Sequence, residues 1–413
     1  MKISWMSRWL GCLVIAIVVA LNVQTKASAQ TFTDVGPNHS YQDIIQDMQA
    51  RGFINGYPDG TFRPNNNITR AHVAVLLDKV LPLEAKTNEV IRYKDVPPSH
   101  TYYKEIMKAS QAGIFSGDPK GNFNPNAPIT RKQMAKVLDL AFELNIETSV
   151  HFPDVEYDWG YMHIQALYSN GVTTGNNGYF NPNAPVTRAH YATFLHRALN
   201  IPTVPNADPN AALSQKQIVN LIYRLPFQSE ITMVAHKSQG LPFSKVRTEL
   251  LNTATQEFTD TLLKRHYAIM CTECDMFLFP FIGAELDYRF EVLENTPNSV
   301  RIRTVSFANI MDDAYFVEYA FKKEAGKWKV AEYDTEPIGA GGFNLTKEEA
   351  LQIVVDAYDA ISVMFLDSEY EYEYDWYTDR EYRRLVYYMY VETEEGDAIV
   401  YFYPHSGFFD EEY

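Results

Sequence analysis

The sequence predicts a multidomain protein in which a mostly α-helical region of three repeats is followed by an α+β region with an antiparallel sheet. Three observations support this prediction. An aromatic-x-Asp-Val motif recurs about every 60 residues between positions 32 and 155, and such a period marks a repeat architecture. A segment with three prolines at 201–210 ends the pattern. After it, helical periodicity gives way to runs of β-branched and aromatic residues, which favour strands.

The three repeats are expected at 31–90, 91–150 and 151–200, and each is predicted to form two helices joined by a glycine-rich turn. The aromatic-x-Asp-Val motif opens each repeat, and apolar residues at helical spacing follow it. The turn ends in Phe-x-Pro-Asn and uses glycine and proline to set its backbone. The equivalent residues are Asp34, Asp95 and Asp154 in the motif, and Gly56, Gly117 and Gly175 in the turn.

The second helix of each repeat is predicted to start at an Ile/Val-Thr-Arg sequence. The threonine suits the N-cap position because its hydroxyl accepts a backbone N–H of the first turn. The arginine that follows, Arg70, Arg131 or Arg188, faces the positive end of the helix dipole, which costs roughly a few tenths of a kcal/mol. Two hypotheses explain this choice. The arginines bind an anion at the helix N-terminus, or each pairs with the aspartate of the repeat motif.

The repeat resembles the S-layer homology (SLH) family. The resemblance rests on the aromatic-x-Asp-Val motif, on Gly-Tyr-Pro-Asp-Gly-Thr-Phe-Arg-Pro-Asn at 56–65 and on Ile-Thr-Arg-Ala at 68–71, and it covers residues 31–200. It implies a pseudo-threefold, mostly helical unit that attaches a secreted protein non-covalently to a secondary polysaccharide of the bacterial cell wall, often a pyruvylated one. It also implies grooves between repeats that are lined by the arginines, the aspartates and the glycines named above.

Departures from the family pattern predict that the three grooves are not equivalent. The family's usual tryptophan is present only as Trp159, in the third repeat, so we expect Arg188 to contribute most to binding. The usual glutamate two residues after the arginine is replaced by His72, Gln133 and His190. Of these, only Gln133 completes a capping box with the preceding threonine. The third glycine-rich turn is one residue shorter than the others.

Residues 1–29 are predicted to be a cleaved signal peptide. Lys2 and Arg8 accompany a short apolar run at 10–21, and Ala-Ser-Ala at 27–29 is a small-residue cleavage site. The apolar run is shorter than the roughly 18 residues that a membrane-spanning helix needs, and so is every later run. We therefore expect a secreted protein that begins at Gln30 and has no membrane span of its own.

Charge excludes some partners. The chain carries a net charge of −16, which becomes −19 when the three cations of the signal segment are removed. Such an acidic chain is unsuited to nucleic acid or anionic lipid, and an acidic glycan must be bound by locally placed cations. No P-loop, Gly-x-Ser-x-Gly or His-Glu-x-x-His motif occurs. No catalytic residue, cofactor or metal is predicted.

Cys271 and Cys274 are the two cysteines outside the signal segment, and they form a Cys-x-x-Cys sequence. A local disulfide or two free thiols are the favoured interpretations. A thioredoxin-like redox site is a weaker alternative because a strand-like run follows, whereas that chemistry needs the start of a helix. A zinc site is also weaker, because two more ligands are required and only His266 is near in sequence.

After the linker, residues 211–340 are predicted to form an α+β domain. Helices are expected at 214–225 and 244–267, and Ala325-Gly326 is expected to close a hairpin. The expected strands are 284–293, 300–307, 315–324 and 327–333. Helices followed by an antiparallel meander resemble, in pattern only, the cystatin-like or nuclear-transport-factor-like domains, and that pattern by itself gives no function.

Residues 343–413 are predicted to form an acidic, tyrosine-rich α+β segment with a helix at 346–364 and strands at 382–393 and 398–403. The alternation of Glu and Tyr from position 369 onward places carboxylates on one strand face and aromatic rings on the other. A half-buried edge strand with a solvated acidic face is the favoured interpretation. A cation-binding or sugar-stacking surface is the alternative, although no calcium-loop spacing is present.

Taken together, the sequence predicts a bacterial cell-surface protein whose repeats bind the cell wall and whose residues 211–413 are displayed for an unassigned task. Two other classes of protein stay open. The first is a wall-modifying enzyme with its site in 211–413, which needs two carboxylates about 5 to 9 Å apart to hydrolyse a glycan. The second is a component of an S-layer lattice.

Overall fold

The computed structural model of the chain describes most of the residues after position 31. The described residues are 32–86, 90–147, 150, 152–201, 211–270, 278–279, 289–307, 314–338, 342–358, 360–375, 380–393 and 396–412. The predicted signal peptide, most of the predicted linker, and Cys271 and Cys274 lie outside them. The chain divides into two compact units, Met1–Phe142 with Pro182–Ile201 and Glu143–Asn181 with Pro202–Tyr413. Each unit is described by itself.

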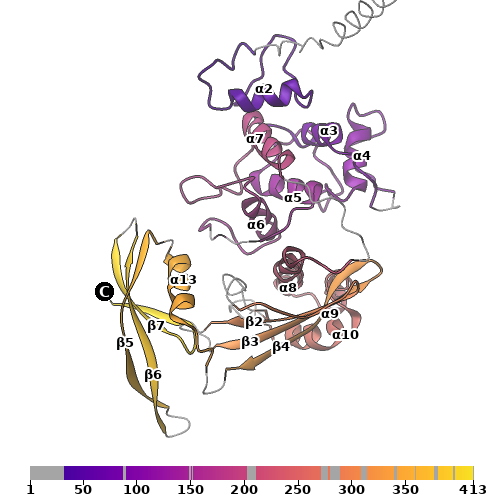
Figure 1. The fold of residues 1–413 in the computed structure, drawn as a ribbon. Helices are drawn as coiled ribbons and strands as arrows, with labels where there is room; N and C mark the ends of the chain where they lie inside the picture. The colour runs from indigo at the N-terminus through magenta and orange to yellow at the C-terminus, as the bar shows by residue number, and fades with distance from the viewer. Residues whose placement is uncertain are drawn as a thin grey trace, which may run out of the picture. The chain divides into compact units, whose positions relative to one another are not determined.

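The repeats are helical only in part, because their helices are short and long loops separate them (Figure 1). The helices described in this region are α2 (Gln42–Ala50), α3 (Arg70–Val80), α4 (Tyr103–Gln111), α5 (Arg131–Phe142), α6 (Tyr161–Ser169) and α7 (Arg188–Leu199). The predicted N-caps are confirmed at all three second helices, and Gln133 completes the predicted capping box with Thr130, whose hydroxyl accepts the Gln133 N–H at 3.3 Å. The Thr69 hydroxyl accepts the His72 N–H at 3.3 Å, and the Thr187 hydroxyl accepts the His190 N–H at 3.2 Å.

The three Ile/Val-Thr-Arg segments meet in a closed ring of backbone hydrogen bonds. The Ile68 N–H donates to the Val186 carbonyl at 2.9 Å, the Ile129 N–H to Ile68 at 3.1 Å, and the Val186 N–H to Ile129 at 2.9 Å. The three side chains are at most 1% exposed. Three equivalent segments that bond in a cycle produce the pseudo-threefold arrangement that the resemblance implies, and they bring the start of each second helix next to another repeat.

The second unit begins with 143–181, the end of the predicted second repeat and the first half of the third, which packs against α8 (Gln215–Lys237). Arg224 Nη2 donates to the Leu144 carbonyl at 2.7 Å, and the Ile146 N–H donates to Asn220 Oδ1 at 3.0 Å. The rings of Tyr161 and Phe227 lie 5.1 Å apart. These contacts mean that 143–181 has apolar and polar partners in the sequence beyond the predicted linker.

Two predicted helices of this region have different bounds in the structure. The helix expected to end at 225 continues through Pro226 to Lys237 as α8, because Ile222, Pro226 and Met233 are buried along one helix and this packing outweighs one missing backbone hydrogen bond. The helix expected at 244–267 is interrupted after α9 (Phe243–Leu250). The chain then forms α10 (Gln256–Phe258), the π-helical η1 (Thr259–Leu263) and α11 (Lys264–Ile269).

The interruption has a cause in the neighbouring sheet. The Val330 N–H donates to the Thr253 carbonyl at 2.8 Å, and the Thr255 N–H donates to the Val330 carbonyl at 2.9 Å. Residues 253–255 therefore lie along β4 as an extended segment. The sheet is an antiparallel meander of β1 (Glu291–Asn295), β2 (Ser299–Ser306), β3 (Tyr315–Glu324) and β4 (Lys327–Pro337). The predicted turn at Ala325-Gly326 joins β3 to β4, and both residues have positive φ.

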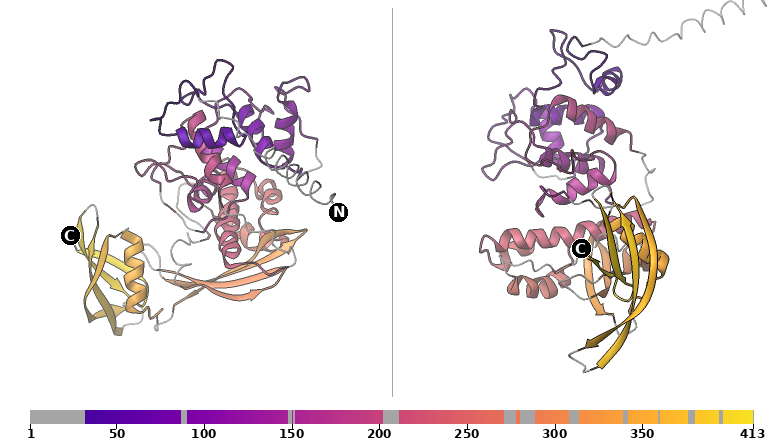
Figure 2. Two further views of the ribbon diagram at one scale, coloured as in Figure 1. Left: turned by 45° about the horizontal axis from the view of Figure 1, so that its top comes forward. Right: turned by 90° about the vertical axis from the view of Figure 1, so that its left-hand side faces the viewer.

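A second four-stranded antiparallel sheet follows α13 (Lys347–Tyr358). Its order is β5 (Ser362–Asp375), β6 (Arg380–Glu392), β7 (Asp397–Tyr403) and β8 (Phe408–Glu412). α13 covers one face of this sheet (Figure 2). The predicted helix 346–364 was too long, since Ser362 and Val363 pair with Glu392 and Val391 in the sheet. β8 was not predicted. β5 is an edge strand, as expected, but Tyr370 and Tyr372 are 54% and 67% exposed, so the expected half-buried aromatic face is not formed at these residues. No helix among the described residues is long and apolar enough to cross a membrane.

Candidate functional site

The motif aspartates bind backbone N–H groups of their own repeat. Asp34 accepts the N–H groups of Phe62 and Arg63, each at 2.7 Å. The other two aspartates do the same: Asp95 with Phe123 and Asn124, and Asp154 with Phe180 and Asn181. The second residue of each pair has a backbone φ near +58°, a conformation that residues other than glycine adopt at a cost in free energy. The carboxylates therefore hold a strained turn in the loop of each repeat.

The loop glycines are needed because the motif aromatic ring lies directly against them. A Cβ atom on Gly56 would be 2.2 Å from the Phe32 ring and 2.8 Å from the Thr61 carbonyl oxygen. On Gly117 it would be 2.8 Å from the Tyr93 ring, and on Gly175 2.6 Å from Phe152. These separations are shorter than any packed carbon contact. In each repeat the motif aromatic ring therefore packs on the loop glycine. Sequence analysis named both residues but did not predict this contact.

Arg70 and Arg188 reach into the loop of a different repeat. Arg70 Nε donates to the Phe123 carbonyl at 2.8 Å, and Nη2 donates to Ser116 at 3.0 Å. Arg188 makes the equivalent bonds to Phe62 at 2.8 Å and Asn55 at 3.1 Å. The hypothesis that each arginine pairs with the aspartate of its own repeat therefore does not describe Arg70 and Arg188, whose partners are carbonyl groups across an interface between repeats.

Both guanidinium groups also lie over aromatic rings. The Arg70 guanidinium is 4.7 Å from the centre of Phe123, and that of Arg188 is 4.6 Å from Phe62 and 5.0 Å from Tyr57. Such stacking stabilises a cation that is partly removed from water. Burial lowers the pKa of both arginines, and more distant groups such as Asp95 and Asp34 offset this only in part. Both remain charged at neutral pH because an arginine pKa lies far above 7.

Neither guanidinium forms an ion pair with any residue that the structure describes. Each donates two of its five N–H groups to carbonyl oxygens and keeps its full positive charge. A carbonyl dipole satisfies a hydrogen bond without neutralising charge. The result is a half-buried cation, fixed in position by two bonds and a ring, with donors left for an external anion.

Arg131 and Trp159, the remaining predicted site residues, have different surroundings. The Arg131 guanidinium lies 5.3 Å from the centre of the Phe194 ring. The backbone N–H of Arg131 donates to the Ala184 carbonyl at 2.9 Å. Trp159 lies just before α6 and is 46% exposed. Arg188, which was expected to contribute most to binding because Trp159 lies in the same repeat, contacts the first repeat.

Two histidines complete the neighbourhood of the second-helix starts, and sequence analysis noted them only as departures from a family pattern. The His72 ring packs edge-on against Tyr102 with centres 5.6 Å apart, and the His190 ring packs in the same way against Tyr41, also at 5.6 Å. His190 Nε2 lies 3.0 Å from the Tyr41 hydroxyl. The signal that could have identified them is their shared position, two residues after Arg70 and Arg188.

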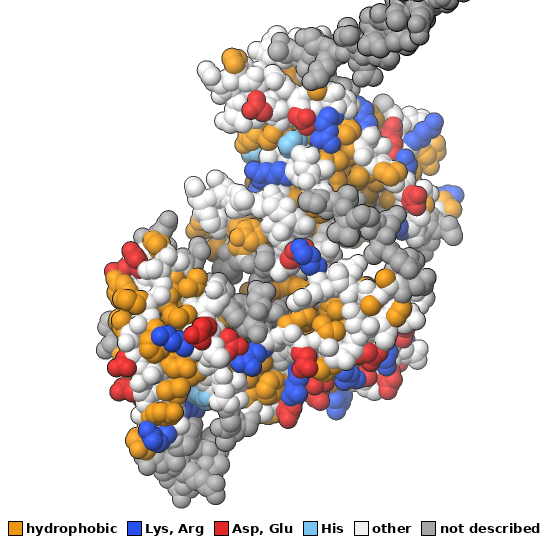
Figure 3. All heavy atoms as spheres, in the orientation of Figure 1, with side chains coloured by type: hydrophobic (Ala, Val, Ile, Leu, Met, Phe, Trp, Pro, Cys, Tyr) orange, Lys and Arg blue, Asp and Glu red, His pale blue; other side chains and the backbone are white. Residues whose placement is uncertain are grey.

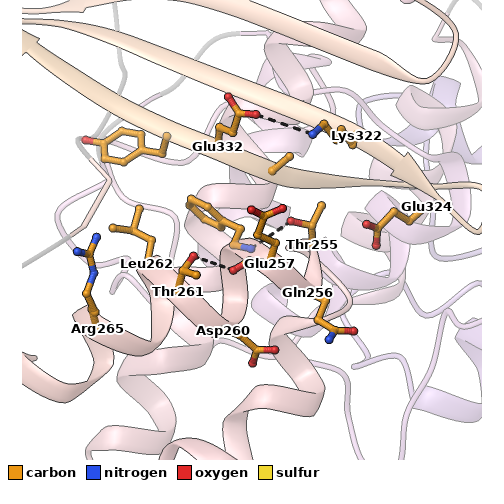
Figure 4. A pocket seen from close by; sticks show the side chains of 13 residues that line it. Thr255, Gln256, Glu257, Asp260, Thr261, Leu262, Arg265, Lys322, Glu324 and Glu332 are labelled. Carbon is orange, nitrogen blue, oxygen red and sulfur yellow. Dashed lines mark hydrogen bonds and ion pairs between the residues drawn. The ribbon is translucent and has the colours of Figure 1, made fainter.

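The second unit has a groove of about 730 Å³ between β4 and residues 255–265 (Figure 4). Its acidic residues are mostly paired with cations: Asp260 with Arg247 at 2.6 Å, Glu324 with Lys329 at 3.0 Å and Glu332 with Lys322 at 3.8 Å. Among the described lining residues, Glu257 alone is a carboxylate without an ion pair. Hydrolysis of a glycoside needs two carboxylates with separate roles, so this groove does not support the enzyme alternative.

The three Ile/Val-Thr-Arg segments are joined in a ring, and Arg70 and Arg188 each bind the loop of another repeat. Comparison with known families identifies the repeats. The S-layer homology domain model matches residues 31–74, 92–135 and 151–192. The chain therefore contains three S-layer homology domains.

Similar proteins carry the same domains on longer chains. A surface-layer 125 kDa protein of Lysinibacillus sphaericus is 32% identical over 260 residues, 58% of this chain and 22% of that protein. S-layer protein EA1 of Bacillus anthracis is 32% identical over 45% of this chain and 22% of its own length. An uncharacterised cell wall amidase of Bacillus anthracis is 34% identical over 44% of this chain and 34% of its length. The chain thus spans between 22% and 34% of the length of these relatives. These matches indicate a secreted cell-surface protein associated with the cell wall.

Proposed function

We propose that the repeat region anchors the chain non-covalently to the bacterial cell wall by binding an acidic secondary wall polysaccharide. The observation that carries this proposal is the state of Arg70 and Arg188. Each is a half-buried cation held by two carbonyls and an aromatic ring, without an ion pair among the described residues. In a chain with 52 acidic and 36 basic residues, leaving such cations unneutralised favours an anionic ligand from outside.

The chemistry of the arginines suits a carboxylate on a sugar. The guanidinium group is planar and presents N–H donors in a fixed fork that matches a carboxylate. Because Nε and one Nη2 hydrogen of each arginine are used by carbonyls, the Nη1 edge is left for the ligand. The adjoining rings of Phe62 and Phe123 are buried and fix the guanidinium groups from below, so the ligand meets the arginine edge itself. A pyruvate ketal, which adds one carboxylate to a hexose, fits this description.

The other predicted residues take supporting roles in this proposal. The aspartates Asp34, Asp95 and Asp154 and the glycines Gly56, Gly117 and Gly175 shape the loops whose carbonyls orient the arginines, so they are positioning residues. We include Arg131 as the third cation by its equivalent place at a helix start. Trp159, which is exposed, is proposed as a sugar-stacking surface.

The test uses the full chain, because 143–181 packs on α8 and a fragment ending at 200 would expose that surface. Wild type and the double variant Arg70→Gln/Arg188→Gln are sedimented with sacculi that retain their wall polysaccharide, and with sacculi from which it has been extracted. Glutamine keeps amide donors but removes the charge. The proposal expects wild type to bind only the unextracted sacculi, and the double variant to bind them at least about a hundredfold more weakly. Equal binding to both preparations would contradict it.

A second candidate function, a component of an S-layer lattice, is supported by the names of two relatives that are S-layer proteins. It predicts that the purified chain assembles into sheets. Negative-stain electron microscopy of the concentrated protein distinguishes the two, since a lattice component forms periodic arrays and an anchored display protein stays dispersed.

A further inference from the structure

The histidines at the second-helix starts form a repeated structure that the proposed binding by arginine does not use. In the first interface the Tyr41 ring contacts His190 and also His39, with centres 5.6 and 5.8 Å apart. In the second interface the Tyr102 ring contacts His72 and His100, at 5.6 and 6.1 Å. The side chains of His39, Tyr41 and His190 thus form one row, and those of His100, Tyr102 and His72 form an equivalent row. Each row joins one repeat to the next.

Comparison with the remaining repeat shows that helix capping does not require these histidines. Gln133 occupies the equivalent position and folds back on its own helix, where its Oε1 accepts the Thr130 N–H at 3.2 Å. At the other two positions the threonine hydroxyl already accepts the backbone N–H. The His72 imidazole bonds back to its own helix through Nδ1, 3.0 Å from the Thr69 hydroxyl, and its ring also packs on Tyr102 of the neighbouring repeat. His190 Nε2 reaches the Tyr41 hydroxyl of the neighbouring repeat at 3.0 Å. The contacts with the two tyrosines therefore have a cause other than the stability of the helix start.

The electrostatic surroundings of both rings are cationic. Burial lowers the pKa of His72, and the Arg188 guanidinium lowers it further. Burial lowers the pKa of His190, and Arg131 adds to this effect. The uncharged groups in contact with the His72 ring are Thr69 and Tyr102, and the one in contact with the His190 ring is Tyr41. No carboxylate pairs with either ring among the described residues. Without a ligand, both histidines are consequently neutral at pH 7.

We propose that His72 and His190 are additional ligand-binding residues of the anchor, and that each takes up a proton and binds an acidic group of the wall glycan together with the neighbouring arginine. This inference rests on the proposed function and adds a regulation to it. The ligand class is a glycan that carries carboxylates spaced to meet an arginine and an imidazole. Attachment then strengthens as the medium becomes more acidic.

The direction of the pH dependence of affinity follows from the linkage between proton binding and ligand binding. A bound carboxylate favours the imidazolium form, so the histidine pKa is higher in the complex than in the free protein. Affinity rises as pH falls through the pKa of the complex, and it levels off below the pKa of the free protein, which lies under the ordinary value of 6.5. A charge-assisted hydrogen bond of ordinary strength corresponds to about tenfold in affinity for each histidine.

The test measures binding of the full chain to polysaccharide-bearing sacculi at pH 7.5 and pH 5.0. Wild type is compared with His72→Gln/His190→Gln, which copies the residue found at the third equivalent position. His196→Gln is the control, since His196 is a surface histidine of the same unit that pairs with Asp47 at 3.3 Å. Melting curves at both pH values verify folding, and the two single variants replace the double variant if it fails to fold.

We expect wild type and His196→Gln to bind at least about tenfold more tightly at pH 5.0, and the double variant to bind equally at both pH values. Each single variant should lose part of the gain. Binding of wild type that does not change with pH overturns this inference alone, as does a double variant that keeps the full gain. Absence of polysaccharide-dependent binding at both pH values overturns the proposed function, and this inference with it.

Discussion

Two arginines of the repeat region, Arg70 and Arg188, have surroundings opposite to those of the arginines on the first sheet. On the β1–β4 sheet, Arg303 pairs with Glu336 at 2.7 Å and Arg301 pairs with Glu332, and Figure 3 shows acidic and basic side chains interspersed along this part of the surface. In the repeats, Arg70 and Arg188 bind carbonyl groups instead. Carboxylates are plentiful in this chain, and the proposed binding of a wall anion gives a reason for holding Arg70 and Arg188 away from them. The comparison therefore sets cations that are neutralised on the surface against cations that keep their charge for the proposed ligand.

The largest loss of stability is expected from a change in the loops whose carbonyl groups bind the arginines. Asp34→Ala removes a carboxylate that accepts two backbone N–H groups at 2.7 Å. The expected loss is about 3 kcal/mol in the free energy of unfolding, because charge-assisted bonds are lost and the turn at Arg63 keeps a positive φ. Thermal and urea unfolding measure it. The control Asp43→Ala, on the exposed surface of α2, should change stability by less than about 0.5 kcal/mol.

A somewhat smaller effect is expected from Gly56→Ala. The new methyl group would meet the Phe32 ring at 2.2 Å, so the ring or the loop must shift, at a cost of about 1–3 kcal/mol. Gly36→Ala is the matched control in the same repeat, since a Cβ there has no neighbour within 4 Å. Equal melting temperatures for the two variants would refute the packing role of the glycine.

The smallest effect is expected in the sheet. Arg301→Ala breaks exposed ion pairs with Glu332 and Glu318, and exposed pairs contribute about 0–1 kcal/mol. Unfolding in 0.05 and 0.5 M salt should show that even this small contribution is screened. A loss above about 2 kcal/mol would mean that the cations of the sheet are as individually important as those of the repeats, and the comparison would fail.

Local features of the repeats could be predicted from the sequence because each is set within a few residues. The second helices begin at Arg70, Arg131 and Arg188, directly after the predicted caps. The partners of the arginines could not be predicted, because they are non-local. Arg188 bonds to the Phe62 carbonyl across 126 positions, and only the cyclic pairing of the three segments determines which repeat it meets. The packing of each loop glycine on an aromatic ring was missed for the same reason.

Errors in the second unit arise where tertiary packing overrides local preference. Pro226 marks a helix end by its chemistry, but its burial in α8 keeps the helix continuous. Residues 362–364 continue a helical pattern, but pairing with β6 places them in a strand. β8 is a short strand at the end of the chain, and its pairing with β7 is what defines it. The alternation of Glu and Tyr in β5 was informative because a period of two is typical of a strand alone.

The most direct test of wall binding by the repeat arginines compares one arginine of the repeats with one arginine of the β1–β4 sheet. Arg188→Gln and Arg301→Gln remove the same charge from the same full chain, and each is measured against polysaccharide-bearing sacculi, with melting curves to correct for the folded fraction. We predict that Arg188→Gln weakens binding by about 1.5–3 kcal/mol, roughly ten- to a hundredfold, because it removes a charge-assisted contact with the wall polysaccharide. No measurable change is predicted for Arg301→Gln. Equal affinities of the two folded variants would contradict the claim that the unpaired arginines of the repeats bind the wall.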